Sequence, residues 1–267
     1  MHLLAPYALE AHLSPLLTAP PPVLVLGGGW GIHFPNDLST NLAIGLRLAH
    51  FLAGITWVGL GYFFVLVGAR WLRDLDAGVR RQAAPPLMQA AMWWFRWSSV
   101  VTVLAGLGLW MMEVGADHRA AGEVHSNLIW SYFVLWTLAY IIYMGILMIP
   151  TDLFQRGPIL AVVTAGLVIV TSWLFLRVNS HGWETNRVLA IGIGGGIGWF
   201  MMFNVWGIIW RFQKRLIRWT AEGTMPPEAA RMARLASLAA RTNAWLSLPM
   251  LFFMGAASHY PLFGGLG

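Results

Sequence analysis

A histidine in the first long apolar stretch of the chain is the residue best placed to do chemistry. His50 is followed by Gly54, Trp57 and Gly61 at helical spacing, so the four share one face of a helix. An imidazole in a segment of membrane-spanning length is costly unless it faces the protein interior and finds a partner there. Glycines on that face let a flat group approach the backbone. The pattern predicts a ligand for haem or a metal ion, or else a neutral histidine that hydrogen-bonds to a neighbouring helix.

A b-type haem held between helices takes a second axial imidazole from another helix. Three histidines are candidates: His259 ends the last apolar stretch, and His125 and His181 lie beside other helix ends. We prefer His259 as the partner of His50, because the end of a membrane helix gives its side chain a fixed direction. The alternatives are a copper, iron or zinc site among the same histidines, or purely structural histidines.

Three arginines are predicted to lie at the same depth in the membrane as these histidines, namely Arg47, Arg177 and Arg187. An arginine fork matches the geometry of a carboxylate, so these side chains are candidates to bind haem propionates. Each one has a simpler alternative role, which is to extend towards the lipid head groups. Together with Gly54 they complete the predicted cofactor site around the haem iron.

The composition is that of an integral membrane protein. Of the 267 residues, 58% are hydrophobic and only 10% are charged, whereas soluble domains carry about 25% charged residues. The chain has no cysteine, which excludes disulfides, thiolate nucleophiles, cysteine-ligated iron–sulfur clusters and covalent haem attachment. The net charge of +6 lies in loops beside apolar stretches. It therefore indicates orientation in a lipid bilayer and argues against a nucleic-acid partner.

The apolar stretches predict an all-α, polytopic membrane bundle of about six transmembrane helices, since a span needs about 20 residues. The predicted spans are residues 42–69, 92–113, 127–149, 158–177, 188–210 and 243–258. The last is short, but it continues an alanine-rich helical stretch that begins near Pro227. The sequence therefore predicts a membrane protein built of helices alone.

Most of the 17 basic residues lie in the loops after the first, third and fifth spans, above all in a loop at 211–242. The positive-inside rule makes that side cytoplasmic and puts both termini on the periplasmic side of a bacterial inner membrane. Three prolines at 20–22 and three glycines at 27–29 interrupt residues 1–41. We expect those residues to form an extramembrane or interfacial arm, with 42–267 as the transmembrane domain.

Two other motifs have competing interpretations. The glycine-rich run 192–198 superficially matches a dinucleotide-binding fingerprint, but it lies in an apolar helix and follows no strand. Close helix packing, or contact with a flat cofactor, are the alternatives for it. The aromatic segment 92–97, which contains Arg96, is typical of a membrane-interface belt, and a quinone pocket is the alternative there.

Several passages resemble the bacterial membrane-bound urate hydroxylases, the urate oxidase N-terminal family. Residues 48–59 are similar to the first helix of the family, 93–97 to its aromatic–basic entry into the next span, and 204–210 to its Asn-Val segment. The most specific match is 241–254 followed by 258–261, which resembles the pattern Asn-x-x-Leu-x-x-Pro-x-x-Phe-x-Met and then Asn-His-Tyr-Pro. One difference is that glycines and isoleucine stand near Gly192, where a family histidine is expected.

The resemblance implies a multispanning oxidoreductase that sends electrons from a substrate towards a cytochrome c. Family members often carry a C-terminal haem c domain, and this chain ends six residues after Pro261. We therefore expect a separate periplasmic cytochrome c, or other membrane subunits, to take that role. The alternatives are a non-catalytic membrane subunit of a larger respiratory or photosynthetic complex, and a copper-handling membrane protein.

Overall fold

The chain divides into two units, residues 1–45 and 46–267. The structure, a computed structural model, describes residues 23–26, 30–33, 35–122, 127–151 and 153–263. In the first unit, β1 (Val23–Leu26) and β2 (Trp30–His33) pair as an antiparallel hairpin. The sequence predicts an arm here and no strand, because four-residue strands are too short to show a clear alternation of apolar and polar residues.

Asp37 caps the first helix, α2 (Leu38–Tyr62). Its carboxylate accepts hydrogen bonds from the backbone N–H groups of Ser39 (3.3 Å) and Thr40 (2.8 Å), and from both hydroxyls. These bonds satisfy donors that the first helical turn leaves without intrahelical partners. The hydrogen bond from the Thr40 hydroxyl contributes most to lowering the pKa of Asp37 well below its ordinary value. The cap therefore stays charged at neutral and mildly acidic pH.

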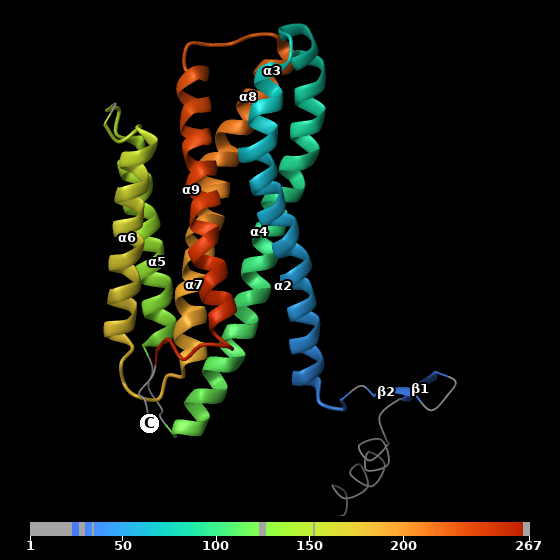
Figure 1. Cartoon of the computed structure of the whole chain (residues 1–267), viewed down its shortest axis with the longest axis vertical. Helices are drawn as coiled ribbons and strands as arrows, with labels where there is room; N and C mark the ends of the chain where they lie inside the picture. The colour runs from blue at the N-terminus through green and yellow to red at the C-terminus, as the bar shows by residue number, and fades with distance from the viewer. Residues whose placement is uncertain (1–22, 27–29, 34, 123–126, 152, 264–267) are drawn as a thin grey trace, which may run out of the picture. The chain divides into compact units, whose positions relative to one another are not determined.

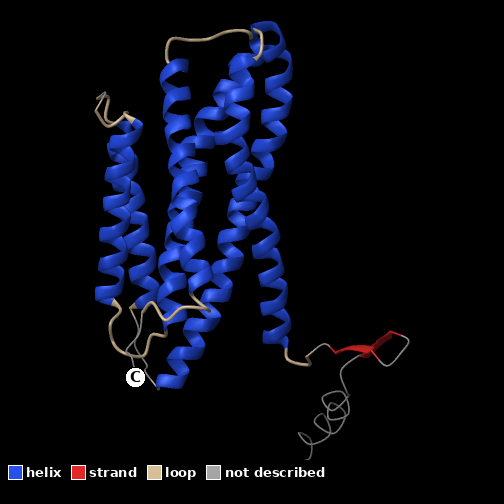
Figure 2. Cartoon of the chain, in the orientation of Figure 1, coloured by secondary structure: helices blue, strands red, loops and turns tan. Residues whose placement is uncertain are grey.

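The second unit consists of long helices joined by short loops (Figures 1 and 2). Its first half contains the end of α2, the π-helical η1 (Phe63–Gly68), α3 (Ala69–Asp74), α4 (Ala77–Ala121), α5 (Leu128–Met148) and α6 (Gly157–Val178). Its second half contains α7 (Asn186–Asn204), the π-helical η2 (Val205–Trp210), α8 (Arg211–Glu222) and α9 (Ala229–Ala256). The predicted all-α membrane bundle is confirmed.

Among the described residues, five continuous helical runs are long and apolar enough to cross a membrane. They are 38–74, 77–121, 128–148, 157–178 and 186–222. The sixth helix, α9, runs antiparallel to α7 over the same length. Near its start, the Arg231 guanidinium donates to the carbonyl oxygen of Met148 (3.2 Å), and beyond its end the Ala257 carbonyl accepts from Asn186 (3.3 Å) at the start of α7.

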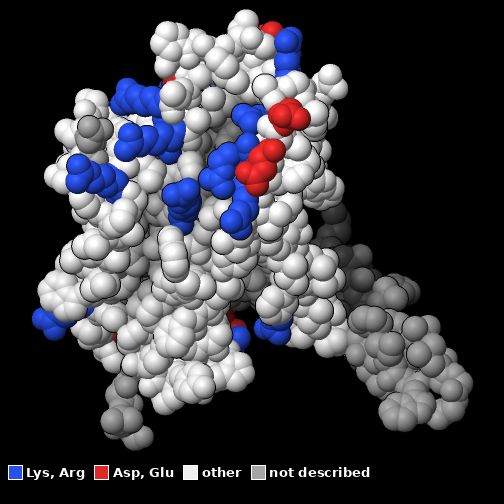
Figure 3. Space-filling view, turned by 45° about the horizontal axis from the view of Figure 1, so that its top comes forward, with Lys and Arg blue, Asp and Glu red and all other residues white. Residues whose placement is uncertain are grey.

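Lysine and arginine gather at the end of the bundle formed by α3, α8 and the start of α9 (Figure 3). This is the end that the positive-inside rule assigns to the cytoplasm. The opposite end, where α4 and α6 finish and α7 begins, is called the outer end below.

Helix α7 forms the core of this unit, because it contacts α4, α5, α6 and α9. In its most apolar stretch 78% of the residues are buried, against 11% in the run that contains α2. Its glycines make that burial possible. A methyl group at Gly196 would overlap the Trp136 indole, and one at Gly192 would approach the Phe175 ring to 2.6 Å. The glycine run therefore serves close helix packing.

Replacing Gly196 by alanine should lower the free energy of unfolding by about 1–3 kcal/mol, because the added methyl group must displace the Trp136 ring in a close-packed core. The measurement is thermal unfolding of the detergent-solubilised protein. Gly166→Ala is the matched control, since a methyl group at Gly166 meets no atom within 4 Å. Equal stability of the two variants would contradict this account of the α7 packing.

Candidate functional site

His50 lies in the part of α2 that packs against α4. Its Nδ1 is 2.7 Å from the backbone carbonyl oxygen of Thr102. The imidazole rests on Gly106, where an added methyl group would come within 2.7 Å of the ring. Gly54 also faces this contact, and a methyl group there would lie 3.6 Å from the Thr102 side chain. The face predicted from the sequence is therefore the face that packs on a neighbouring helix.

The hydrogen bond to Thr102 decides the tautomer of His50. A carbonyl oxygen only accepts hydrogen bonds, so Nδ1 carries the proton and Nε2 keeps its lone pair. No hydrogen bond engages this Nε2 among the residues that the structure describes. Histidines that bind metals show this arrangement, in which one ring nitrogen ligates and the other donates to a backbone carbonyl. The geometry suits an axial ligand, and it equally provides the interhelical partner of the structural interpretation.

No contact among the described residues joins a candidate second ligand to His50. His259 is exposed and lies just beyond the end of α9, and its Nδ1 is 2.8 Å from the carbonyl oxygen of Gly255 in the last turn of that helix. His181 pairs with Glu184 at 2.7 Å. His125 lies outside the described residues. Within the described part of the chain, no hydrogen bond, ion pair or ring contact joins two histidines, and no group of three metal-ligating side chains forms.

The arginines of the predicted site also separate. Arg47 and Arg177 are exposed, and neither forms an ion pair with a described residue. Arg187 pairs with Glu113, with 2.8 Å between Nη2 and Oε1. The exposed side chains are free to extend towards lipid head groups, whereas Arg187 belongs to a polar cluster that the sequence does not reveal.

This outer cluster joins the end of α4 to the start of α7. Besides the ion pair between Arg187 and Glu113, Asp117 accepts a hydrogen bond from the Thr185 hydroxyl (2.6 Å). The His118 imidazole meets the edge of Trp183, with 5.3 Å between ring centroids. Nothing in the sequence indicates that these residues meet, because they come from two elements about 70 positions apart along the chain.

Two nitrogens of the outer cluster are buried and have no hydrogen-bond partner among the described residues. They are Nε2 of His118 and Nε of Arg187. A buried polar atom without a partner is costly, so such atoms mark positions where water or a ligand completes the structure. The cluster therefore offers an arginine donor and an imidazole beside an indole ring, which is a chemistry suited to a planar anionic molecule.

A second set of polar residues holds α7 to α9 in the middle of the bundle. The Asn204 amide donates to Oδ1 of Asn243 (2.8 Å) and to the carbonyl of Ala239 (3.0 Å), and the Asn243 amide donates to the carbonyl of Met201 (3.0 Å). Both asparagines are buried. Their role is structural, because hydrogen bonds between side chains fix the register of two helices in a membrane.

The family model described as urate oxidase N-terminal matches residues 37–265. The chain belongs to this family. The match begins at the Asp37 cap and extends beyond the end of α9, so every membrane helix described above lies within the family's domain. The resemblance inferred from the sequence is thereby confirmed. Searches of curated proteins and of solved structures found no match.

Replacing Gly106 by alanine should move the His50 ring, because the new methyl group occupies the place of its Cε1 and Nδ1 atoms. We expect the hydrogen bond to Thr102 to lengthen and the Nδ1-protonated tautomer to lose its preference. Nitrogen-15 NMR of histidine-labelled protein measures this. Gly59→Ala is the control, since nothing lies within 4 Å of a methyl group there. An unchanged His50 signal in Gly106→Ala would refute the contact.

Proposed function

We propose that this chain is the membrane domain of an oxidoreductase of the urate hydroxylase type, which oxidises a planar anionic substrate and passes electrons to a periplasmic cytochrome c. The single observation that carries the proposal is the family match over residues 37–265. Two features of the structure support it. One is a histidine with a free ring nitrogen in α2, and the other is the polar cluster at the outer end.

The outer cluster is the proposed substrate site. Nε of Arg187 provides a buried donor for an anionic oxygen or ring nitrogen, and Glu113 holds the guanidinium in place through its other side. Nε2 of His118 provides a proton acceptor, and Trp183 a flat surface. Hydroxylation of a purine with water as the oxygen source releases two electrons and two protons. The imidazole would take up one proton, the second proton would pass to water at the outer end, and the two electrons would pass to cytochrome c in two one-electron steps.

A b-type haem is the proposed cofactor, and His50 would bind its iron. His50 has a ring nitrogen suited to this role. Its Nδ1 hydrogen-bonds to the carbonyl of Thr102, which leaves Nε2 available for iron. His259 is the proposed second ligand, because its Nδ1 is likewise held by a backbone carbonyl. When bound, such a haem supplies a one-electron carrier. Arg47 and Arg177 remain the candidates to bind its propionates.

The cofactor is tested by the absorption spectrum of the purified, dithionite-reduced protein. We expect an α-band at the b-type position, and we expect His50→Ala to abolish it because an axial ligand is removed. His181→Ala is the control, since His181 is occupied by its ion pair with Glu184. A band that survives in His50→Ala would remove His50 as a ligand. A wild type without any band would favour a non-catalytic subunit, or a copper-handling protein if metal analysis finds copper.

The substrate site is tested by urate-dependent reduction of added cytochrome c. Arg187→Gln should raise the KM for urate about tenfold or more, which corresponds to loss of one charge-assisted hydrogen bond. Arg177→Gln is the matched control, because Arg177 is exposed and forms no ion pair with a described residue. Equal KM values for the two variants would place the substrate elsewhere, and no reduction by the wild type would reject urate.

A further inference from the structure

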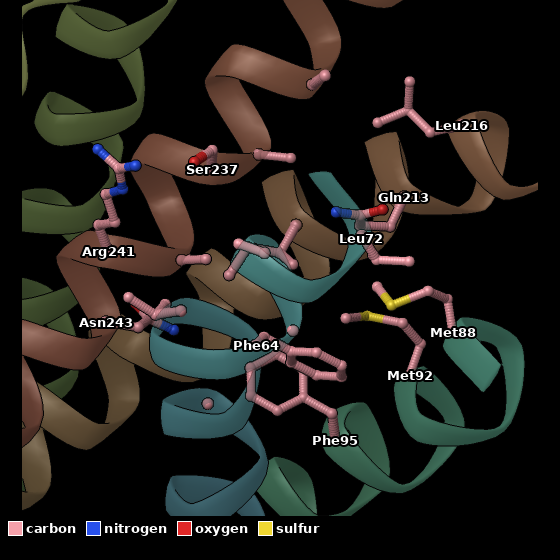
Figure 4. Close-up of a pocket in the computed structure, with 18 of the residues that line it drawn as sticks. Phe64, Leu72, Met88, Met92, Phe95, Gln213, Leu216, Ser237, Arg241 and Asn243 are labelled. Atoms are coloured by element: carbon pink, nitrogen blue, oxygen red, sulfur yellow. The ribbon is translucent and has the colours of Figure 1, made fainter. Parts of the chain in front are cut away.

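A cavity of about 720 Å³ lies towards the basic end of the bundle (Figure 4). Its walls come from α2, η1, α3, α4, α7, η2, α8 and α9. Cavities that bind small molecules measure about 300–1,000 Å³, so this one has the size of a binding site. Neither His50 nor any residue of the outer cluster lines it. The cavity is therefore separate from the site described above.

Methionine and aromatic side chains line much of the cavity. Figure 4 shows Met88 and Met92 of α4 on one side, with Phe95 and Phe64 beside them. The two phenylalanine rings meet edge to face, with 5.4 Å between centroids. Further thioether and aromatic side chains in the lining are Trp57, Met201 and Met225. Thioethers and ring edges make favourable contacts with flat conjugated rings.

The polar groups of the cavity favour a ligand that accepts hydrogen bonds. No aspartate or glutamate is among the lining residues. Most of the lining donors already have protein acceptors, namely Tyr62 with Ser247 (2.7 Å), Ser247 with Ala244 (2.7 Å), Thr220 with Leu216 (2.8 Å) and Asn243 with Met201 (3.0 Å). The half-buried amide of Gln213 has no hydrogen-bond partner among the described residues. The side chains of Arg241 and Ser237 also have no hydrogen-bond partner among the described residues, but both residues are exposed. Gln213 is therefore the half-buried donor left for a carbonyl oxygen of a ligand.

Two π-helical segments contribute to the same cavity. Phe64, Val65 and Gly68 come from η1, and Ile209 comes from η2. A π-helical turn interrupts the regular i to i+4 hydrogen-bond pattern of a helix, and such turns are frequent at functional sites. Their meeting at one cavity is an observation independent of its volume and lining, and it points to a bound molecule.

The cavity opens at the side of the bundle. Lining residues on both of its walls are exposed, including Ala69 of α3 and Ala233 and Ser237 of α9. The run that contains α2, η1 and α3 is long and apolar enough to cross a membrane, so an opening beside it is accessible to a lipid-soluble molecule. A ligand that enters here comes from the bilayer, so it has an apolar portion as well as a polar ring.

From these observations we infer that the cavity binds the ring of an isoprenoid quinone. Such a quinone has a flat ring, two carbonyl acceptors and a long apolar tail. The Gln213 amide would donate to one carbonyl, and the thioethers of Met88 and Met92 and the rings of Phe64 and Phe95 would enclose the ring. The tail would leave between α3 and α9. This binding site goes beyond the proposed function and depends neither on haem nor on urate.

The test uses the full chain in nanodiscs that retain native lipid, with quinone extracted and quantified per protein by mass spectrometry and the affinity for decylubiquinone measured by titration. Ala233→Trp fills the cavity and should reduce bound quinone at least tenfold. Gln213→Leu keeps the side-chain size and should weaken decylubiquinone binding about tenfold, the effect of one hydrogen bond. The matched control is Ala161→Trp, which fills a second cavity of about 890 Å³ between α6 and α9.

Retention of quinone by the wild type and by Ala161→Trp, with loss in the two cavity variants, supports the inference. Quinone at the background level of the surrounding lipid, or equal loss in Ala161→Trp, overturns it. Phospholipid that is lost from Ala233→Trp in place of quinone also overturns it, and identifies the cavity as a lipid site. Gln213→Leu decides the question alone if Ala233→Trp does not fold, which its circular dichroism and thermal unfolding would reveal.

Discussion

The burial of α7 on all its sides is the constraint on which the packing of this protein depends. In lipid the hydrophobic effect does not drive one apolar helix onto another, so helices associate through close contact and a few hydrogen bonds. The glycines of α7 provide that contact, with Trp136 and Phe175 seated where side chains would otherwise stand. Asn204 adds the hydrogen bonds that fix α7 against α9. The arrangement of the helices around α7 follows from these small and polar residues.

This packing leaves the chemistry at the ends of the bundle. At the outer end, α4 and α7 bring Glu113 and Arg187 together, and the loop before α7 places Trp183 against His118. Towards the basic end, residues of the two π-helical segments line a mostly apolar cavity. The amide of Gln213 in its wall has no hydrogen-bond partner among the described residues. A second cavity of about 890 Å³ lies between α6 and α9, and Ile193 and Ile197 of α7 form part of its lining. The two proposed sites therefore lie at different parts of the bundle, the outer cluster at one end and the apolar cavity towards the other.

The sequence predicted more of the fold than of the site. Apolar length alone identified the helical membrane bundle, since a bilayer accepts few other structures. It placed the start of the second span at 92, whereas α4 begins at Ala77 and includes Pro85 and Pro86. The predicted span follows from apolar length alone, and the two prolines give no signal for a longer helix, because proline usually interrupts one. The fifth helical run likewise continues to Glu222, because α8 follows η2 without a break.

By itself the sequence determined the class of structure, the family and the fact that the His50 face packs inside the protein, because each depends on local composition and spacing. Only the tertiary structure decided what that face touches: the carbonyl of Thr102 and the flat surface of Gly106. It also decided that the outer cluster exists, since Glu113 and Arg187 lie far apart along the chain and meet only when α4 packs on α7. A contact between two helices depends on how their surfaces fit together. The sequence describes each surface but does not show which two surfaces meet.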